Sequence, residues 1–298
     1  RCILVVTPWK RRWERGHGAG LADDVHFIAG LIGHGYDVHY VSPRDREPPD
    51  VTAPGYHVHS FPNFYDATQG WPRLFKRLLW PLLFTVLAGW RAWRVGETVQ
   101  PTVVLGQTYV ASAAAFLAAR VLRVPSVVKL FGVMDLADER SPRWQRLRRQ
   151  TEMIVALRFP HEAWIVLDDG TRGDKALRDR GVPSARIHFL PNGVNLEWLS
   201  AMSNSEWLPE RYGIMRYSHL VLYLARLVDW KRADAFVRVA ARVKAQTRRV
   251  AFVVAGDGPE RARCEALARS LQIENQVYFV GAIPHAHIPD AMATADVL

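Results

Sequence analysis

The apolar positions of this chain follow the pattern of a parallel α/β fold. Short uninterrupted apolar runs alternate with longer segments in which apolar residues recur every three or four positions. The runs are typical of strands buried on both faces of a parallel sheet, and the periodic segments of helices packed against it. We expect strands at residues 2–6, 37–41, 56–61, 102–105, 126–131, 163–167, 186–190, 220–224 and 250–255.

One strand–helix–strand unit carries candidate chemistry at both of its turns. An apolar run is followed by a polar turn with Arg226 and Lys231, and then by a helix over 233–246 with one apolar face. The next apolar run ends in the turn Gly256-Asp257-Gly258, ahead of another helix. Ligands of open α/β sheets bind beyond the carboxyl ends of the strands, so both turns are candidate site elements.

Two cations beside a glycine turn suit a ligand that carries phosphate groups. Arg226 offers a forked, permanent charge and Lys231 a mobile point charge. Free backbone N–H groups at the helix start add partial positive charge. The ordinary alternative for both residues is a solvated surface cation, and spacing alone leaves the two interpretations open.

The segments ARLVDWKR and VVAGDGPE together resemble the donor-binding half of glycosyltransferase family 4, retaining enzymes with the two-domain GT-B fold. The resemblance implies that Arg226 and Lys231 are the catalytic cations, which hold and stabilise the departing diphosphate of a nucleotide-sugar. It extends to VYFVGAIPHAHIPDAMATADVL, where it implies that the backbone of Val280 and Gly281 lies against the nucleotide base. The donor-binding residues expected in this half are Gly256, Asp257, Gly258, Val280 and Gly281.

A glycine-rich loop, Gly16-His17-Gly18-Ala19-Gly20, follows the first predicted strand. Together with the helix and strand that follow it, this loop is similar to the glycine-rich fingerprint of dinucleotide-binding folds. However, clean G-x-G-x-x-G spacing is missing, and so is an acidic residue at the end of the second strand, which argues against NAD or FAD. The loop instead resembles the paired-glycine loop of the family, which implies that Gly18 and Gly20 face the donor phosphates.

The length of 298 residues suggests about two domains. PNGVN, at 191–195, resembles the junction between the domains of the family, and its turn chemistry makes Asn192 and Gly193 the expected hinge. We expect two Rossmann-like domains facing across a cleft: an acceptor-side domain over 1–195 and a nucleotide-sugar-binding domain over 196–298. The chain stops as another strand begins, so we expect the second domain to be incomplete and the natural protein to carry about 70–100 further residues.

Composition narrows the classes of partner. The formal net charge of +10 favours anionic partners, such as phosphorylated substrates, a membrane face or nucleic acid. No helix-turn-helix, zinc or RNA-recognition signature is found, so no nucleic acid partner is expected. Neither an Asp-x-Asp motif nor a His/Asp cluster with ligand spacing occurs, so we expect no metal and no cofactor. Cys2 and Cys264, the only cysteines, fit a reducing, cytoplasmic compartment.

The segment 71–94 carries four tryptophans, five basic residues and no acidic residue. Its apolar core, 78–90, is too short to span a bilayer, which takes about 20 residues. Basic residues flanking bulky aromatics are typical of a helix that lies in the interface of an anionic membrane. A helix packed on the sheet is the alternative, and both can hold for different faces. The first interpretation predicts a peripheral position on the inner face of the membrane.

The predicted reaction is transfer of a hexosyl group from a nucleotide-sugar donor to an acceptor hydroxyl with retention. The expected acceptor is a glycan or a lipid-linked compound, as in the biosynthesis of cell-envelope polysaccharide. Phe131-Gly132 stands where many family members have His-Gly, so the usual catalytic histidine is not expected here. The alternatives are a basic nucleic-acid-binding protein, or a sugar-nucleotide epimerase or phosphorylase on the same fold.

Overall fold

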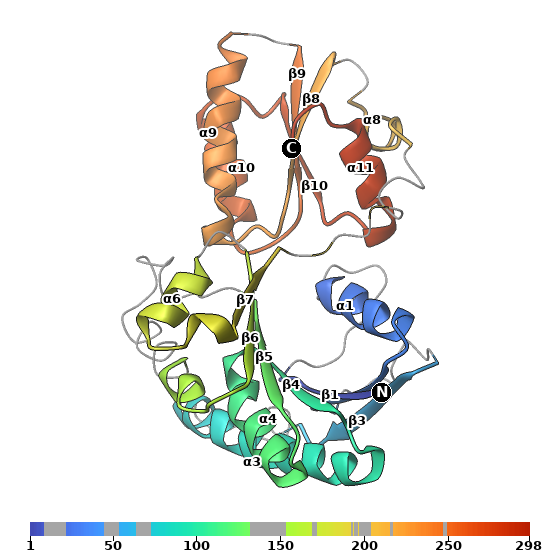
Figure 1. The fold of residues 1–298 in the computed structure, drawn as a ribbon. Helices are drawn as coiled ribbons and strands as arrows, with labels where there is room; N and C mark the ends of the chain where they lie inside the picture. The colour runs from blue at the N-terminus through green and yellow to red at the C-terminus, as the bar shows by residue number, and fades with distance from the viewer. Residues whose placement is uncertain are drawn as a thin grey trace. The chain divides into compact units, whose positions relative to one another are not determined.

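The computed structural model describes residues 1–8, 22–44, 54–63, 73–131, 153–168, 172–191, 193, 196, 204–214, 217–246 and 249–298. These residues form two compact units. One holds the described residues as far as Gly193, and the other holds those from Leu196 onward. Each unit is built on a parallel sheet with helices on both faces (Figure 1). The predicted α/β class is therefore confirmed.

The first unit contains a seven-stranded parallel sheet with the order β3-β2-β1-β4-β5-β6-β7. The interior position of β1 explains why its run CILVV is apolar on both faces. Each strand lies within two residues of the predicted bounds. The strands are β1 (Cys2–Val6), β2 (Asp37–Pro43), β3 (Tyr56–Phe61), β4 (Val103–Gln107), β5 (Ser126–Leu130), β6 (Ala163–Leu167) and β7 (Ile187–Leu190).

Helices on the two faces of this sheet complete the core of the first unit (Figure 1). Helix α1 (Ala22–Gly33) packs on one face, with Ile28 fully buried. The other face is covered by α3 (Arg73–Val99), α4 (Thr108–Leu122) and α6 (Gly173–Asp179). A short 3-10 turn, η1 (Ser184–Arg186), leads into β7.

Helix α3 covers most of the segment 71–94, for which the sequence left open a helix in a membrane interface or a helix packed on the sheet. One face of α3 belongs to the core. Phe84, Ala88 and Ala92 are fully buried against the sheet and α4. Phe84 also meets Phe61 of β3 edge to face, with ring centroids 5.7 Å apart. The packed-helix alternative is therefore correct for this face. Among the described residues, we find no helix whose length and hydropathy would allow it to cross a bilayer.

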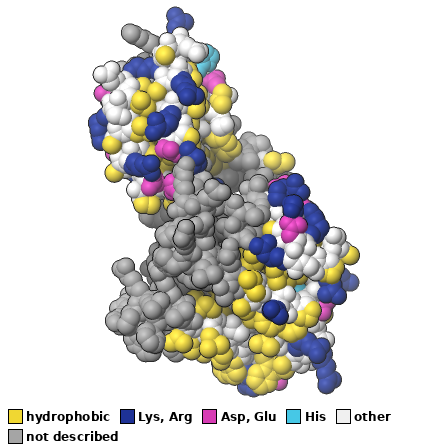
Figure 2. Space-filling view, turned by 90° about the vertical axis from the view of Figure 1, so that its left-hand side faces the viewer, with side chains coloured by type: hydrophobic (Ala, Val, Ile, Leu, Met, Phe, Trp, Pro, Cys, Tyr) yellow, Lys and Arg dark blue, Asp and Glu magenta, His cyan; other side chains and the backbone are white. Residues whose placement is uncertain are grey.

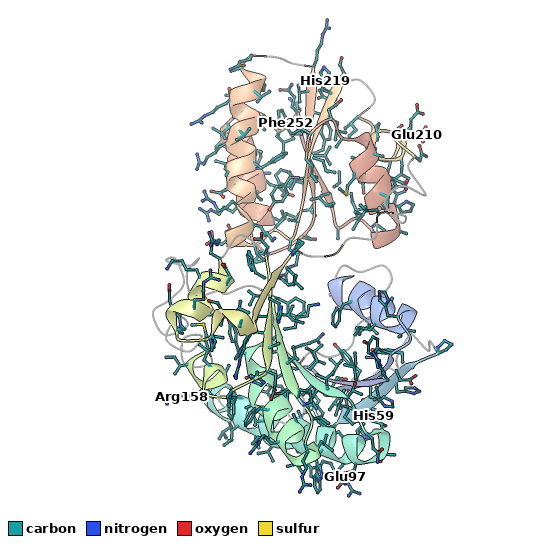
Figure 3. All side chains as sticks on the ribbon, viewed as in Figure 1. His59, Glu97, Arg158, Glu210, His219 and Phe252 are labelled. Carbon is teal, nitrogen blue, oxygen red and sulfur yellow. The ribbon has the colours of Figure 1, made fainter. Side chains whose placement is uncertain are left out.

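The second unit has a three-stranded parallel sheet with the order β10-β9-β8. The central strand is buried along its whole length, and Phe252 lies in the core on one side of it (Figure 3). Helices α9 and α10 cover that face, while α8 and α11 cover the other. The elements are α8 (Trp207–Tyr212), β8 (His219–Leu224), η2 (Asp229–Lys231), α9 (Ala233–Lys244), β9 (Val250–Ala255), α10 (Arg261–Ser270), β10 (Val277–Gly281), η3 (His285–His287) and α11 (Ile288–Thr294).

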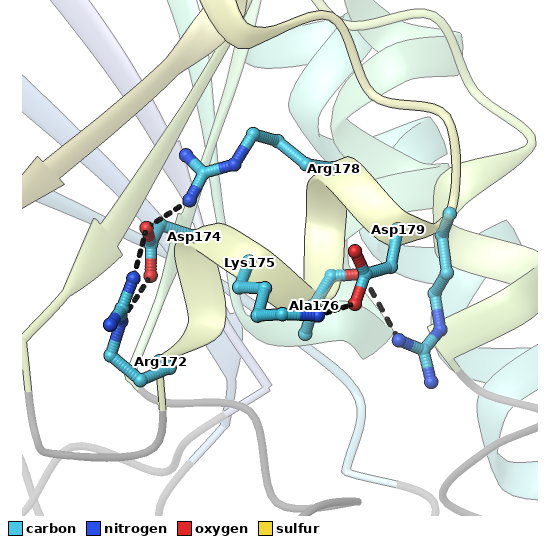
Figure 4. A network of polar contacts seen from close by, with 7 residues as sticks. Arg172, Asp174, Lys175, Ala176, Arg178 and Asp179 are labelled. Atoms are coloured by element: carbon cyan, nitrogen blue, oxygen red, sulfur yellow. Dashed lines mark hydrogen bonds and ion pairs between the residues drawn. The ribbon is translucent and has the colours of Figure 1, made fainter.

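An ion-pair cluster stabilises the start of helix α6. The carboxylate of Asp174, in the first turn, lies between the guanidinium groups of Arg172 and Arg178 (Figure 4). Hydrogen bonds from Arg172, and then from Arg178, hold the pKa of Asp174 well below its usual range. A negative charge at this end of a helix also interacts favourably with the helix dipole. Helix α6 has no side-chain cap at its start, and the described contacts there are these ion pairs.

A buried polar network ties together three parts of the first unit. The ring of His161, fully buried, has one nitrogen 2.8 Å from Ser112 Oγ of α4 and the other 2.9 Å from Ser126 Oγ of β5. The backbone N–H of Ser126 donates to the Glu162 carboxylate at 2.7 Å. Burial lowers the pKa of His161 to about 4, so the ring is neutral at neutral pH.

We expect the free energy of unfolding to fall as the pH is lowered through the range from 6.5 to about 4, in part because of His161. The unfolded chain takes up a proton at the ordinary pKa, whereas the folded protein does so only near the lowered value, so acid favours unfolding. The stability lost over this range should be about 3 kcal/mol from this residue. Denaturant unfolding at a series of pH values measures it.

The variant His161→Asn distinguishes the contribution of His161 to the acid sensitivity from the contributions of other histidines. Burial also lowers the pKa of His39 and of His59, whose rings are hydrogen-bonded at 2.9 Å, so they too contribute to acid sensitivity. Asn cannot take up the proton, so the variant should lose less stability on acidification than the wild type. An equal loss in both proteins would contradict the assignment to His161.

Candidate functional site

The candidate site is the carboxyl edge of the three-stranded sheet. The register pairs both Leu224 and Gly281 with Ala255, so the three parallel strands end at the same level. The loops that follow them therefore start side by side. The structure places at this edge all the residues predicted to bind the donor in this half: Arg226, Lys231, Gly256, Asp257, Gly258, Val280 and Gly281.

Two glycines allow the first two loops to touch backbone to backbone. Gly256 and Gly258 have φ angles of 144° and 156°, which side chains rarely permit. A Cβ at Gly256 would overlap the carbonyl oxygen of Ala225, and one at Gly258 that of Leu227. The backbone N–H of Leu227 donates to the carbonyl oxygen of Asp257 at 2.9 Å. This interlock fixes the backbone on both sides of Arg226.

The third loop joins the same assembly through Gly281 and Arg261. The backbone N–H of Gly256 donates to the Gly281 carbonyl oxygen at 2.7 Å. Arg261, at the start of α10, donates to the Phe279 carbonyl oxygen at 3.3 Å and lies 3.6 Å from the Asp257 carboxylate. The hydrogen-bonded ion pair between Arg261 and Glu265 raises the pKa of the Arg261 guanidinium.

Arg261 was not among the predicted site residues, although the sequence carries a signal for it. It stands in the first turn of the helix that follows the Gly-Asp-Gly turn, with acidic residues four positions before and four positions after it. Such spacing predicts ion pairs along a helix but does not reveal that the side chain also reaches β10. That contact depends on the pairing of β9 with β10, which a local pattern cannot supply.

Both predicted cations are exposed at this edge. Lys231 ends the short helix η2, and its carbonyl oxygen accepts a hydrogen bond from the Tyr223 hydroxyl at 3.0 Å, which anchors the turn to β8. Within the described part of the chain, the Lys231 ammonium forms no ion pair. The neighbouring Arg232 instead pairs with Asp234 at 3.0 Å. Lys231 therefore presents a positive charge to solvent beside the glycine turn.

A row of buried polar side chains crosses the carboxyl end of the seven-stranded sheet. Ser42, Thr7, Gln107 and Lys129 follow one another across β2, β1, β4 and β5, on the face that α1 covers. Two residues earlier on the same strands, the side chains are those of Tyr40, Val5, Leu105 and Val127. The polar row therefore begins where the apolar core ends.

The contacts of this row are specific. The Tyr40 hydroxyl donates to Gln107 Oε1 at 3.0 Å, and the Lys129 ammonium lies 4.0 Å from the centre of the Phe27 ring and 4.8 Å from that of Phe131. The predicted strand over 126–131 included Lys129 without assigning it a role. A lysine inside an apolar run was the signal that could have identified it.

Two further features mark the same edge. Among the described residues, the buried hydroxyl of Ser42 finds no hydrogen-bond partner, and neither does that of Thr108, which begins α4 directly after β4. Thr108 also has a φ of 74°, a conformation that β-branched residues rarely adopt. Unpaired buried hydroxyls and backbone strain both carry a free-energy cost, and strain of this kind is concentrated at functional sites.

Several predicted positions lie outside the described residues: Gly18, Gly20, Asn192 and Gly132. Gly193, the other predicted hinge residue, is exposed, and the space where its Cβ would stand is open. Among the described residues, no group of three or more His, Cys, Asp or Glu side chains is arranged to hold a metal ion.

Two family models match the chain, and together they cover most of it. The model described as Glycosyltransferase Family 4 matches residues 25–198, and the one described as Glycosyl transferases group 1 matches residues 208–298.

Characterised relatives are distant and longer than this chain. The alpha-D-kanosaminyltransferase of Streptomyces kanamyceticus is 28% identical over 190 residues, which are 61% of this chain and 48% of the relative. A GDP-mannose-dependent alpha-(1-6)-phosphatidylinositol monomannoside mannosyltransferase of Mycolicibacterium smegmatis is 29% identical over 116 residues, 39% of this chain and 30% of the relative. The matches span about half of the first relative and less than a third of the second.

Solved structures share the fold. Anabaena HepE in complex with UDP matches with a TM-score of 0.68 at 18% identity, over 99% of this chain and 72% of that one. Sucrose-phosphate synthase of Thermosynechococcus elongatus matches with a TM-score of 0.70 at 16% identity, over 99% and 73%. At such identities the likeness concerns the fold alone, which is the GT-B fold of glycosyltransferases. Since the first family model covers more than half of the sequence, the chain belongs to Glycosyltransferase Family 4.

Proposed function

We propose that this protein is a retaining glycosyltransferase that moves a hexosyl group from a nucleoside-diphosphate sugar to an acceptor hydroxyl. One observation carries the proposal: the backbone interlock around Gly256 and Gly258, which holds the exposed residue Arg226 beside the glycine turn at the carboxyl edge of a parallel sheet. Membership of the family and the fold of its structural neighbours support it.

In the proposed reaction, the bond between the anomeric carbon and the diphosphate oxygen breaks, and the acceptor oxygen forms a new bond on the same face of the sugar. The proton of the acceptor hydroxyl passes to the departing diphosphate. Negative charge grows on the departing diphosphate in the transition state. Arg226 and Lys231 stabilise that charge, the first through its planar fork and the second as a point charge. Because these two side chains supply the positive charge, the reaction needs no metal and no cofactor.

The nucleotide is assigned to the loop ends that meet at Gly256. The backbone of Val280 and Gly281 lies against the base, while Asp257 and the glycines of the turn contact the donor. The titles of the HepE structures name UDP and UDP-glucose, and one relative is GDP-mannose-dependent, which supports a nucleoside-diphosphate sugar as donor class.

The acceptor is assigned to the first unit, so that residues 1–195 form the acceptor side and 196–298 the donor side, with Asn192 and Gly193 as hinge. The polar row with Gln107 and Lys129 lies at the carboxyl edge of the seven-stranded sheet, and open α/β sheets bind ligands beyond this edge, which supports placing the acceptor at this end of the unit. Relatives named for phosphatidylinositol and a structural neighbour named for lipopolysaccharide biosynthesis support a glycan or lipid-linked acceptor. A cytoplasmic, peripheral location would suit such an acceptor.

One experiment separates this proposal from the alternatives on the same fold. The protein is incubated with labelled nucleotide-sugars, with and without a mixture of glycan and lipid-linked acceptors, and the products are analysed by NMR. A glycosyltransferase consumes the donor in an acceptor-dependent way, and retention appears as the unchanged anomeric configuration. An epimerase would change the sugar without an acceptor, and a phosphorylase would require inorganic phosphate.

We expect Arg226→Ala and Lys231→Ala each to reduce turnover on the order of a hundredfold or more, because each removes a charge that stabilises the transition state. Both residues are exposed, so the unfolding curve should not change. Arg242→Ala, on the exposed side of α9, is the matched control and should retain full activity. Wild-type turnover and donor affinity in either site variant would refute the assignment.

We also expect Gly258→Ala to weaken nucleotide binding and to destabilise the second unit by about 1–3 kcal/mol, because the new Cβ forces the interlocked loops apart. Calorimetric titration with UDP and GDP, together with thermal unfolding, measures the two effects. Gly30→Ala in α1 is the control, since its Cβ meets open space and alanine favours a helix. If Gly258→Ala behaves like Gly30→Ala, the interlock does not shape the site.

A further inference from the structure

Helices α3 and α4 present an apolar outer face in addition to the face that each buries in the core. Leu82, Val86 and Trp90 recur every four residues along α3, and Leu117 and Val121 do so along α4. These five side chains are 48–62% exposed. Helices on a globular surface normally turn polar and charged residues toward solvent, so this face departs from the pattern.

The apolar rows of the two helices are neighbours. Gly89 of α3 faces the backbone of Ala114, and Gly96 faces the side chain of Leu122, so the helices lie side by side along this length. Half-buried Trp93 stands three positions after Trp90 and therefore on the same side of α3. Figure 2 shows apolar side chains gathered at the lower end of the molecule, where Figure 1 places α3 and α4.

Cations border this face, and the stretch of sequence that contains the two helices is poor in acidic residues. Arg94 continues the row of α3 one turn beyond Trp90, and its side chain is 57% exposed. Arg120 is exposed on α4, three positions after Leu117. Between residues 73 and 131 the sequence has eight basic residues and a single acidic one, Glu97, which lies 3.6 Å from Arg94.

This charge distribution decides between two kinds of occupant. A second copy of the same face would bring Arg94 and Arg120 against their equivalents, and within residues 73–131 Glu97 is the one acidic residue available to balance them, which disfavours self-association. An anionic bilayer offers the opposite charge at its surface and an apolar layer beneath it. Bulky apolar side chains bordered by arginines match that profile.

We propose that the outer face of α3 and α4 docks on an anionic lipid bilayer, with Val86, Trp90 and Val121 entering the headgroup region. Binding by this face does not depend on the proposed reaction. The contact differs from the one expected from the sequence, because it centres on residues 82–94 and adds α4, which that expectation did not include.

Co-sedimentation with lipid vesicles tests the proposal. The wild-type protein should bind vesicles that contain about one-third phosphatidylglycerol, bind phosphatidylcholine vesicles poorly, and be released by salt. The double variant Val86→Asp/Trp90→Asp should lose at least about tenfold in partition coefficient, since it replaces apolar side chains that enter the headgroup region with carboxylates, which anionic lipids repel. Val239→Asp, at a 51% exposed site on α9, is the matched control and should bind like the wild type.

The arginines are tested separately. Arg94→Ser and Arg120→Ser should each weaken binding to the anionic vesicles about fivefold, whereas Arg242→Ser should have no effect. Circular dichroism and thermal unfolding establish that all variants are folded. Failure of the wild type to bind anionic vesicles at low salt would overturn the proposal. Light scattering that detects a dimer, lost in Val86→Asp/Trp90→Asp, would assign the face to a second copy instead.

Discussion

The candidate donor site depends on the close approach of two peptide segments. The loop after β8 and the turn after β9 touch through main-chain atoms, which is possible only because Gly256 and Gly258 have no side chain. Arg226 lies between Ala225 and Leu227, whose carbonyl groups contact Gly256 and Gly258. The backbone on both sides of Arg226 is therefore held in place. A charged side chain stabilises a transition state best when the backbone that carries it is already in position. If that backbone had to move during the reaction, the free-energy cost of the movement would offset the stabilisation.

Helix α3 combines two requirements that a sequence pattern cannot separate. Its buried face carries Phe84, Ala88 and Ala92, while Leu82, Val86 and Trp90 point outward. Because α3 has apolar residues on both its inner and its outer face, its sequence supports two interpretations: a helix packed on the sheet and a helix that lies on a membrane. The packing of α3 against the sheet and against α4 determines which residues belong to the core, through contacts such as that of Phe84 with Phe61 and that of Gly89 with Ala114.

The strands could be predicted from the sequence, because parallel strands buried on both faces leave uninterrupted apolar runs. Helix α9 could be predicted because its apolar residues recur on one face. The loop residues at the carboxyl edge of the three-stranded sheet could be located because glycine turns and cations follow such runs directly. The role of Arg261 could not, since its contact with Phe279 crosses between strands. The polar row in the first unit was missed for a similar reason. Lys129 stands out singly, as a lysine inside an apolar run, but Thr7 and Gln107 do not, and the three form a row only when the strand order is known.

That row has a consequence for how the sheet is assembled. Successive side chains on a strand point to opposite faces, so sliding a strand by a single residue exchanges its two sets of side chains. If β4 or β5 slipped in this way, Gln107 or Lys129 would enter the apolar layer beneath α3 and α4, where neither the amide nor the ammonium would find a partner among Val104, Ala111 and Ala115. The polar residues therefore penalise incorrect strand alignment during folding.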